Sequence, residues 1–555
     1  MDYNYLAELL FPDVKETVDD IEKRFPERNL PEGAVVSRLA PSPTGFVHLG
    51  NIMQGLTSER LAHQSGGVLY LRVEDTDAKR EVAGASEMLI EMLSHYGIIF
   101  DEGAALDENG KICDKGAYGP YKQSERAEIY HVYAKKLVRE GKAYPCFCTE
   151  EELERFHAEQ EAEKANFGYY GKWAKWRDRP IEDIEAELSA GKKWVLRFRS
   201  TGSIEHKFKY NDLIKGEVDI TENDIDHVLL KSDGIPTYHF AHAIDDHLMH
   251  TTHVVRGDEW LASLPFHIQL FNALDHKLPK YVHIGTLMKM DGNSKRKLSK
   301  RKDPELALSY YKAQGYPTES VIEYMLTILN SNFEDWRRAN PDAPIGDFKF
   351  SVKKMNAAGS LFDIAKLCDV SKNVIAKFDA EKVYSYVLEW AKDYDPDFAK
   401  ELEAEKEASI AVLSIGRGGK KPRKDIAVWT DVKDYMGFIF DGYYNAEGEY
   451  PENFDKKLIA DVLKAYIEVY SENDEQTEWF DKIKDVSEKF GFARETKEYK
   501  ASPESYKGHV GDISAFIRVA VTGKQNAPDL YSVMKIMGKD KIVSRINAQI
   551  ERLSK

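Results

Sequence analysis

Short apolar runs alternate with helical segments over residues 34–96, and this alternation constrains the fold more than any other feature. An apolar run at 34–40 predicts a buried strand, and a Pro/Gly-rich loop and a helix over 51–64 follow it. A second strand is predicted at 67–73 and a second helix at 82–96. Such strand–loop–helix repeats are typical of an α/β fold with a doubly wound parallel sheet.

The same alternation resumes after a long interruption. Apolar runs at 227–231, 253–256 and 281–284 predict further strands, with a helix over 261–273 between the last two. The block at 142–224 is less regular and contains both α and β patterns. We therefore expect an α/β domain inserted into the sheet domain.

The C-terminal part has a different pattern. Apolar residues recur there at spacings of three and four, as at 319–329 and 456–471, which predicts a mostly α-helical C-terminal half. The expected regions are an N-terminal helical extension (1–33), the first half of the sheet domain (34–141), the inserted domain (142–224), the second half of the sheet domain (225–304), a linking region (305–380) and a helical region (381–555).

The composition fits a soluble globular protein, since 31% of the 555 residues are charged and 42% are hydrophobic. No apolar run approaches the roughly 20 residues that span a bilayer, the first residues lack a secretory-signal pattern, and four cysteines do not form a disulfide framework. We expect a cytoplasmic protein without membrane contact. The net charge of −16 disfavours nucleic-acid binding by the surface as a whole, but basic runs at 295–302 and 417–424 allow it locally.

A motif suited to phosphate binding lies between the first predicted strand and helix. It reads Arg38-Leu-Ala-Pro-Ser-Pro-Thr-Gly45 and continues into His48-Leu-Gly-Asn51. Unpaired N–H groups at a helix N-terminus attract phosphate, glycines allow close approach, and His48 can donate to a phosphoryl oxygen in the transition state. For His-x-Gly-x alone, a Pro-rich turn with a capping histidine would be the better interpretation.

A second motif, Lys297-Leu-Ser-Lys-Arg301, follows about 250 residues later. Mobile lysines near a triphosphate can neutralise charge when pyrophosphate leaves the α-phosphate of ATP. An isolated basic run would indicate a solvated loop instead. Its place just past the last predicted strand favours the nucleotide role.

Together, the two motifs resemble the His-x-Gly-His and Lys-Met-Ser-Lys-Ser signatures of class I aminoacyl-tRNA synthetases. The departures from these signatures are Asn51, Leu298 and Arg301. The segment Arg72-Val-Glu-Asp-Thr-Asp77 and the stretch 229–260 resemble the glutamyl-tRNA synthetase family of bacterial type. The resemblance is strong over about 34–380 and weak beyond.

The resemblance implies a Rossmann-like catalytic domain with an inserted acceptor-binding domain and a helical anticodon-binding region. It implies that ATP with Mg²⁺ activates L-glutamate to glutamyl-adenylate. The glutamyl group then passes to the terminal adenosine of a glutamate-accepting tRNA, by attack of the 2′-hydroxyl and with activation that depends on tRNA. By the same resemblance we expect a monomer.

The resemblance also assigns roles to residues. The expected catalytic residues are His48, Lys297 and Lys300. The expected ATP-binding residues are Pro41, Ser42, Thr44, Gly45, His48, Gly50, Asn51, Glu259, Trp260, Lys297, Ser299 and Lys300. The expected glutamate-binding residues are Arg38, Ala40, Ser42, Glu74, Tyr238, His242 and Arg256.

Two carboxylates of the substrate need cationic partners, and guanidinium groups match carboxylates well. Arg38 and Arg256 are the candidates, and the sequence leaves open which arginine takes which carboxylate. The resemblance pairs Glu74 with the α-ammonium group. For His242, packing or water contact is as good an interpretation as substrate contact.

Two further features concern RNA and metal. The expected tRNA-binding residues are Arg417, Lys420, Lys421, Arg423 and Lys424, with a solvated loop as the alternative. Cys146 and Cys148 resemble the start of a zinc site, but a closed site needs four ligands, and Cys113 and Cys368 are remote in the sequence. We therefore expect no structural zinc and no other protein-bound metal.

Three alternatives remain. The first is a glutaminyl-tRNA synthetase, which the form of 40–45 and the helical C-terminal half disfavour. The second is a small-molecule nucleotidyltransferase, which the long C-terminal half and the lysine motif disfavour. The third is an inactive RNA-binding paralogue, which the intact Arg38, His48, Glu74, Arg256 and Lys300 disfavour.

Overall fold

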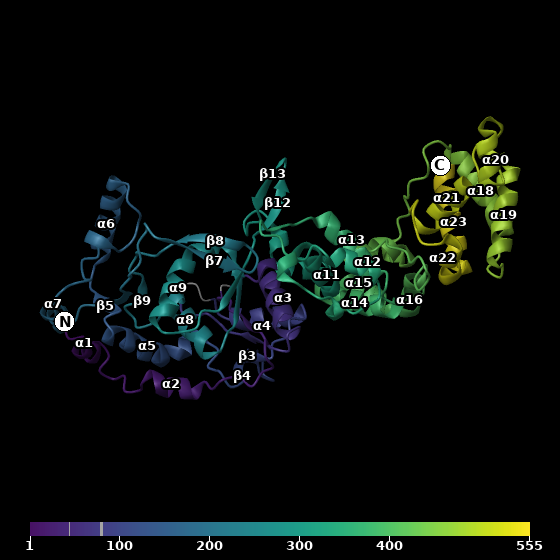
Figure 1. Cartoon of the computed structure of the whole chain (residues 1–555). Helices are drawn as coiled ribbons and strands as arrows, with labels where there is room; N and C mark the ends of the chain where they lie inside the picture. Colours follow the sequence, from purple (N-terminus) through teal and green to yellow (C-terminus); the bar gives the residue numbers. More distant parts are fainter. Residues whose placement is uncertain (44, 78–81) are drawn as a thin grey trace. The chain divides into compact units, whose positions relative to one another are not determined.

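The computed structural model describes residues 1–43, 45–77 and 82–555, and the chain forms two compact units (Figure 1). Unit 1 contains residues 1–308 and 325–362, and unit 2 contains residues 309–324 and 363–555. The six regions expected from the sequence have finer boundaries than these units and stay predictions.

A six-stranded sheet with the order β11-β10-β1-β2-β3-β4 is the centre of unit 1. Its strands are β1 (Val36–Leu39), β2 (Val68–Leu71), β3 (Glu102–Leu106), β4 (Ile112–Lys115), β10 (His253–Gly257) and β11 (Lys280–Ile284). Five strands are parallel, and β4 pairs antiparallel with β3 at the edge. The predicted Rossmann-like α/β fold is confirmed, with a mixed rather than wholly parallel sheet because β3 and β4 form a hairpin.

The strand order reverses at β1, which lies between β10 and β2. In open α/β sheets, ligands bind beyond the carboxyl ends of the strands at such a reversal. The helix that follows β1, α3 (Leu49–His63), packs against β1, β2 and β10 through buried residues such as Ile52, Met53 and Leu56. Its N-terminus therefore opens at the carboxyl end of β1.

Several other helices of unit 1 lie outside its inserted part. They are α1 (Tyr3–Leu10), α2 (Val18–Arg24), α4 (Ala85–His95), α5 (Ala127–Arg139), α8 (Tyr238–Leu248), α9 (Leu264–Ala273) and α12 (Phe333–Ala339). The N-terminal helices α1 and α2, purple in Figure 1, lie along α5. Lys135 of α5 donates hydrogen bonds to the carbonyls of Phe11 and Val14, so the predicted helical extension is anchored to the body of unit 1.

The inserted part of unit 1 has its own antiparallel sheet. It consists of β5 (Ala143–Cys146), β6 (Val195–Phe198) and β9 (Val228–Leu230), with α6 (Glu150–Glu163) and α7 (Ile181–Ser189). The sequence interpretation that placed 227–231 in the resumed alternation of the main sheet is wrong, because β9 pairs with β6. A short apolar run identifies a strand but does not specify its partner.

Two smaller sheets complete unit 1. The hairpin of β7 (Lys207–Asp212) and β8 (Gly216–Thr221) packs against the main sheet, where Ile220 contacts a cluster that contains Tyr281 of β11. The second sheet has the order β13-β12-β14, with β12 (Leu287–Asp291), β13 (Ser294–Lys297) and β14 (Ser360–Leu361). This second sheet carries the lysine motif.

The described residues from 363 onward are mostly helical, which confirms the predicted mostly α-helical C-terminal half. Helices α10 (Leu308–Gln314) and α11 (Thr318–Leu329) lie at the junction of the units in the chain. The rest are α13 (Ile364–Ile375), α14 (Ala380–Tyr394), α15 (Pro396–Ala404), α16 (Lys406–Ser414), α17 (Thr430–Met436), α18 (Lys456–Val469), α19 (Gln476–Lys489), α20 (Thr496–Ala501), α21 (Val510–Thr522), α22 (Leu530–Met537) and α23 (Lys539–Ser554). Among the described helices, none is both long and apolar enough to cross a bilayer.

Candidate active site

The loop of the first motif ends at His48, the N-cap residue of α3. Asn51 Oδ1 accepts a hydrogen bond from the backbone N–H of His48 at 2.9 Å, so the asparagine serves the helix start. Burial, with repulsion from Lys300 and Lys297, lowers the pKa of His48 to about 4. The imidazole is therefore neutral at pH 7, and its buried Nδ1 has no hydrogen-bond partner within the described residues.

The same loop is tied to the neighbouring strand. The carbonyl of Pro41 accepts a hydrogen bond from the backbone N–H of Glu74 at 3.0 Å, just beyond the end of β2. The loop thus links the predicted ATP contacts to the predicted glutamate contacts. Its other predicted residues are Ala40, Ser42, Gly45 and Thr44, of which Thr44 lies outside the described residues.

The lysine motif begins at the last residue of β13, and packing and hydrogen bonds hold its backbone in place. Leu298 is buried and donates its backbone N–H to the carbonyl of Leu287 at 3.0 Å, which gives leucine a packing role at this position. The backbone N–H of Ser299 donates to Asp303 Oδ2 at 2.9 Å, and Arg296 forms a bidentate pair with the same carboxylate at 2.6 and 2.7 Å. The loop is held at Leu298 and Ser299, while Lys297 and Lys300 remain exposed.

A cavity of about 460 Å³ brings the two motifs together. Its lining includes the predicted ATP-binding residues His48, Gly50, Glu259, Lys297, Ser299 and Lys300. Lys300 Nζ lies 4.3 Å from the centre of the Phe46 ring, in the loop of the first motif. Glu259 is a carboxylate that could assist Mg²⁺, which prefers oxygen ligands and is usually held largely by phosphates and water.

Other predicted ATP contacts do not line this cavity. They are Pro41, Ser42, Gly45, Asn51 and Trp260. Trp260 packs instead against Tyr238, with ring centres 4.3 Å apart. The sequence interpretation did not include Gly257, Gly285 and Thr286, which line the cavity at the carboxyl ends of β10 and β11. Their place at the carboxyl ends of parallel strands could have indicated them.

One side of the predicted amino-acid pocket, which we call the β1–β2 wall, consists of Arg38, Arg72, Glu74 and Asp246. Arg38 Nε lies 3.2 Å from Asp246 Oδ2, and Arg72 bridges Asp246 and Glu74 at 2.7 and 3.0 Å. Burial alone would raise the pKa of Asp246, but Arg38 and Arg72 outweigh it and hold the pKa well below its usual range. Burial raises the pKa of Glu74. In this wall, every guanidinium has a carboxylate partner.

A second group of buried residues, which we call the β10–β11 wall, consists of Arg256, Tyr281, His283 and His267. Arg256 is 3% exposed. Its Nε donates to His283 Nε2 and its Nη1 to His267 Nδ1, both at 3.0 Å, and its guanidinium lies 4.3 Å from the centre of the Tyr281 ring. Within the described residues, no carboxylate pairs with Arg256, and its buried Nη2 has no hydrogen-bond partner.

Tyr238, at the start of α8, connects the two walls. Burial raises the pKa of its hydroxyl. The hydroxyl also interacts electrostatically with Arg256, Glu74 and Arg38. The structure thus brings together the charged residues predicted to bind glutamate. Their roles in binding stay predictions.

His242, the remaining predicted contact, is fully buried on α8. Its Nε2 lies 3.0 Å from the Tyr281 hydroxyl and its Nδ1 2.8 Å from Asp246 Oδ2. Burial lowers the pKa of His242 to about 4, so the ring is neutral at pH 7. Both nitrogens therefore lie against protein groups, which favours the packing interpretation.

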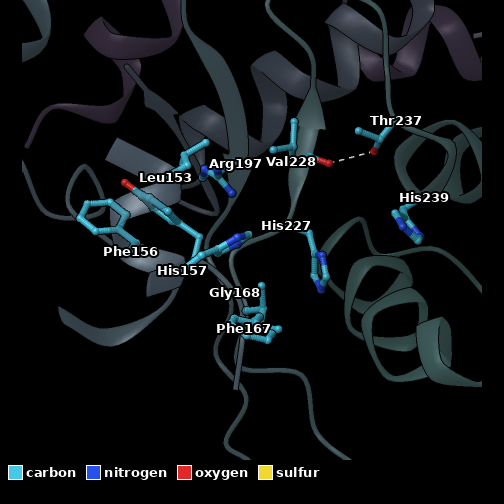
Figure 2. A pocket seen from close by; sticks show the side chains of 12 residues that line it. Leu153, Phe156, His157, Phe167, Gly168, Arg197, His227, Val228, Thr237 and His239 are labelled. Atoms are coloured by element: carbon cyan, nitrogen blue, oxygen red, sulfur yellow. Dashed lines mark hydrogen bonds between the residues drawn. The ribbon is translucent and has the colours of Figure 1, made fainter. Parts of the chain in front are cut away.

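A second cavity, of about 440 Å³, lies beside the inserted sheet (Figure 2). Leu153 and Phe156 of α6 lie on one side and His239 of α8 on the other, as Figure 2 shows. His239 Nδ1 lies 2.8 Å from His267 Nε2. This cavity therefore reaches His239, which contacts His267, one of the two histidines that hold Arg256.

Two clusters have the side chains that metal ions use. The thiols of Cys146 and Cys148 both lie 3.5 Å from the Tyr169 hydroxyl. Among the described residues, Glu22, His247 and His276 place one ligand atom each within 4.8 Å of one another. The two imidazoles are stacked at 3.6 Å with an angle of 8°, so one ion cannot lie in both ring planes. This arrangement does not fit a metal site.

The predicted basic cluster in unit 2 is only partly available to RNA. Arg417 donates to the carbonyls of Ile375 and Phe378 at the end of α13, and Arg423 pairs with Asp425 at 2.6 Å. Charge in the sequence does not distinguish such internal uses from solvent-facing ones. The predicted residues that remain exposed without these contacts are Lys420, Lys421 and Lys424.

Unit 2 also has a cavity of about 430 Å³ that the sequence interpretation missed. Trp479 and Phe480 of α19 line it together with Lys484 and Arg518. Burial lowers the pKa of Arg518, and its Nε has no hydrogen-bond partner within the described residues. A single arginine in a helical segment gives no sign in the sequence that it lines a cavity.

Comparison with known proteins identifies the family. Residues 34–335 match the family described as tRNA synthetases class I (E and Q), catalytic domain, and residues 422–550 match an anticodon-binding domain. The chain is 51% identical to a glutamate–tRNA ligase of Acetivibrio thermocellus and 49% identical to one of Clostridium perfringens, over 98% of this chain and at least 99% of each relative.

Solved structures agree with these relatives. A glutamate tRNA ligase from Elizabethkingia meningosepticum, crystallised with its amino acid, has a TM-score of 0.72 and 27% identity, over 94% of this chain and 99% of that one. The enzyme from Elizabethkingia anophelis has a TM-score of 0.71 and 28% identity, over 93% and 100%. The chain belongs to the glutamate–tRNA ligase family of class I tRNA synthetases.

Proposed function

We propose that this protein is a glutamate–tRNA ligase. An oxygen of the α-carboxylate of L-glutamate attacks the α-phosphorus of ATP. The bond from this phosphorus to the β,γ-phosphates breaks, and pyrophosphate leaves with the electron pair. The terminal ribose hydroxyl of tRNA then attacks the activated carbonyl, and AMP leaves. Both steps need positioned reactants and neutralised phosphate charge rather than a covalent enzyme intermediate.

The cavity of about 460 Å³ is the proposed ATP site. His48 is neutral there and lies between the helix start and the lysine loop, so it can donate a proton in a hydrogen bond without adding charge. Lys297 and Lys300 are exposed and line the same cavity, where they would neutralise the triphosphate as pyrophosphate departs. Mg²⁺ bound to the phosphates would add to this neutralisation.

The single observation that favours glutamate is the state of Arg256. A buried guanidinium without a carboxylate partner is costly, and an anionic ligand removes that cost. Arg38 already faces Asp246, so Arg256 is the proposed partner of the substrate side-chain carboxylate. The neutral amide of glutamine would leave the charge of Arg256 uncompensated, which disfavours a glutaminyl-tRNA synthetase.

We infer that tRNA contacts residues 422–550, which match an anticodon-binding domain. Trp479 and Phe480 offer aromatic faces for an unstacked base, and the unpartnered Nε of Arg518 offers a donor. Lys420, Lys421 and Lys424 are the proposed phosphate contacts, since they remain exposed. Arg417 and Arg423 drop out of this proposal because they contact protein groups.

Charging of a glutamate-accepting tRNA with labelled glutamate tests the proposal. The wild-type protein should give acid-precipitable glutamyl-tRNA only with ATP present. Lys300→Ala should slow glutamyl-adenylate formation about 100- to 1000-fold, the effect of removing one group that stabilises transition-state charge. Lys111→Ala, another exposed lysine but in the turn between β3 and β4, should leave the rate of adenylate formation unchanged. Absence of glutamyl-tRNA with the wild-type protein would refute the proposed function.

A further inference from the structure

A chain of three side chains runs into the amino-acid pocket from the β7–β8 hairpin. Asp212 is the last residue of β7, His283 lies on β11, and Arg256 is its register partner on β10. Asp212 Oδ2 lies 2.7 Å from His283 Nδ1, and Arg256 Nε lies 3.0 Å from His283 Nε2. All three residues are buried. A carboxylate outside the proposed substrate site thus reaches Arg256 through one imidazole.

The partners of Asp212 fix its protonation state. Its Oδ1 accepts hydrogen bonds from the backbone N–H groups of Ile214 and Lys215, both at 2.9 Å. Burial alone would raise the pKa of Asp212, but hydrogen bonds from His283 and these two N–H groups outweigh it and hold the pKa below its usual range. Asp212 is therefore ionised and accepts hydrogen bonds from all of these donors.

The state of His283 follows from its two neighbours. Burial lowers the pKa of His283, so the ring carries one proton at neutral pH. Because ionised Asp212 only accepts, the proton lies on Nδ1, and Nε2 presents a lone pair. Arg256 only donates, so its Nε–H meets that lone pair. Asp212 thus selects the one tautomer of His283 that can hold Arg256.

The second contact of Arg256 is built in the same way. Its Nη1 donates to His267 Nδ1 at 3.0 Å, and His267 Nε2 lies 2.8 Å from His239 Nδ1. Burial lowers the pKa of His267 as well, so two neutral imidazoles hold the guanidinium. Neither supplies a negative charge, and Nη2 is left without a partner within the described residues.

We propose that Asp212 and His283 are positioning residues that direct the unpartnered Nη2 of Arg256 toward the side-chain carboxylate of glutamate. The inference rests on the proposed function, since it assumes that glutamate binds at Arg256. A neutral imidazole orients the guanidinium without neutralising it, whereas a carboxylate at the same place would compete with the substrate. Arg38, whose Nε faces Asp246 directly, shows that alternative arrangement in the same unit.

Asp212→Asn tests the tautomer. The asparagine oxygen keeps the two backbone N–H bonds if its amide nitrogen faces His283, and that nitrogen then donates to Nδ1. His283 must move its proton to Nε2, where it opposes the N–H of Arg256. The expected result is a KM for glutamate raised about 10- to 100-fold in ATP–pyrophosphate exchange with tRNA present, the range for losing one charge-assisted hydrogen bond. The KM for ATP should stay within about twofold.

A pair of substitutions at His283 separates positioning from packing. His283→Phe keeps a ring but loses the acceptor, and it should raise the glutamate KM as much as Asp212→Asn. His283→Gln can accept from Arg256 through its side-chain oxygen, and it should recover most of the affinity. Glu22→Gln is the matched control, because Glu22 lies 2.8 Å from His247 in another carboxylate–imidazole pair of unit 1. It should leave the glutamate KM unchanged.

Three results would overturn the inference. These are an unchanged glutamate KM in Asp212→Asn, equal defects in His283→Gln and His283→Phe, or parallel rises in the KM for ATP and glutamate. If Asp212→Asn does not fold, the comparison of the two His283 variants still decides. Failure of the proposed function looks different, because the wild-type protein would then show no glutamate-dependent exchange.

Discussion

The two walls of the amino-acid pocket hold their arginines in opposite ways. Arg38 and Arg72 of the β1–β2 wall face Asp246, while Arg256 of the β10–β11 wall faces neutral imidazoles. A charge that is compensated inside the protein mainly supports the fold. A buried charge that is left uncompensated destabilises the protein unless a ligand of opposite sign binds to it. From this difference we propose that the β10–β11 wall selects the substrate.

The largest expected effect is on stability, in the β1–β2 wall. Asp246→Asn removes the shared partner of two buried arginines and should lower the free energy of unfolding by about 3–5 kcal/mol. Urea unfolding, followed by tryptophan fluorescence, would measure this change. Asp219→Asn, an exposed aspartate on β8, is the control and should change stability by less than about 0.5 kcal/mol. Equal stability of the two variants would break the comparison.

The next effect is on substrate binding, in the β10–β11 wall. Arg256→Leu should raise the KM for glutamate by about 30- to 1000-fold, equivalent to about 2–4 kcal/mol of lost binding. Because Arg256 has no carboxylate partner among the described residues, the folded protein should keep or gain thermal stability. Steady-state exchange and melting curves measure the two quantities on the same sample. A strong loss of stability with normal glutamate affinity would reverse the roles of the walls.

A smaller, pH-dependent effect on stability is expected at an imidazole outside the pocket. His63, at the end of α3, lies 3.0 Å from Glu59 and 2.9 Å from Asp101. The hydrogen bond with Glu59, together with Asp101, outweighs burial and raises the pKa of His63 to about 9. Carboxylates thus keep this imidazole protonated, unlike His283 in the β10–β11 wall.

The sign of the effect follows from the folded state binding the proton more tightly. The stabilisation is complete below the unfolded pKa of about 6.5 and is lost as the pH rises through about 9. After allowance for solvent screening it amounts to about 1–2 kcal/mol. His63→Gln should therefore lower the melting temperature at pH 6 but not at pH 9.5. A larger deficit at pH 9.5 would contradict this.

The sequence predicted the parts of the site that depend on local pattern. The strand–loop–helix unit around His48 and the lysine motif were predicted separately, and the structure joins them through Lys300 and Phe46. Arg38, Glu74, Tyr238 and Arg256 were also expected in one pocket. Each of these residues lies in a segment with a distinctive sequence pattern, so the neighbouring residues indicated its role.

The parts that were missed depend on pairing between distant segments. Strand β9 looks like the other buried strands but pairs with β6. Asp212 is one acidic residue in a polar hairpin, and only the docking of that hairpin on β11 places it beside His283. Arg417 belongs to a basic run, but the end of α13 takes its guanidinium. Local sequence carries no information on such partners.

Selection of the amino acid is the most direct test of the role assigned to Arg256. ATP–pyrophosphate exchange should be measured with glutamate and with glutamine, in the presence of tRNA, for the wild-type protein and for Arg256→Leu. The wild-type protein should show a kcat/KM for glutamate that exceeds the value for glutamine by at least about 100-fold, and Arg256→Leu should lose most of this preference. Equal use of both amino acids by the wild-type protein, or an unchanged preference in Arg256→Leu, would contradict the role of the uncompensated arginine.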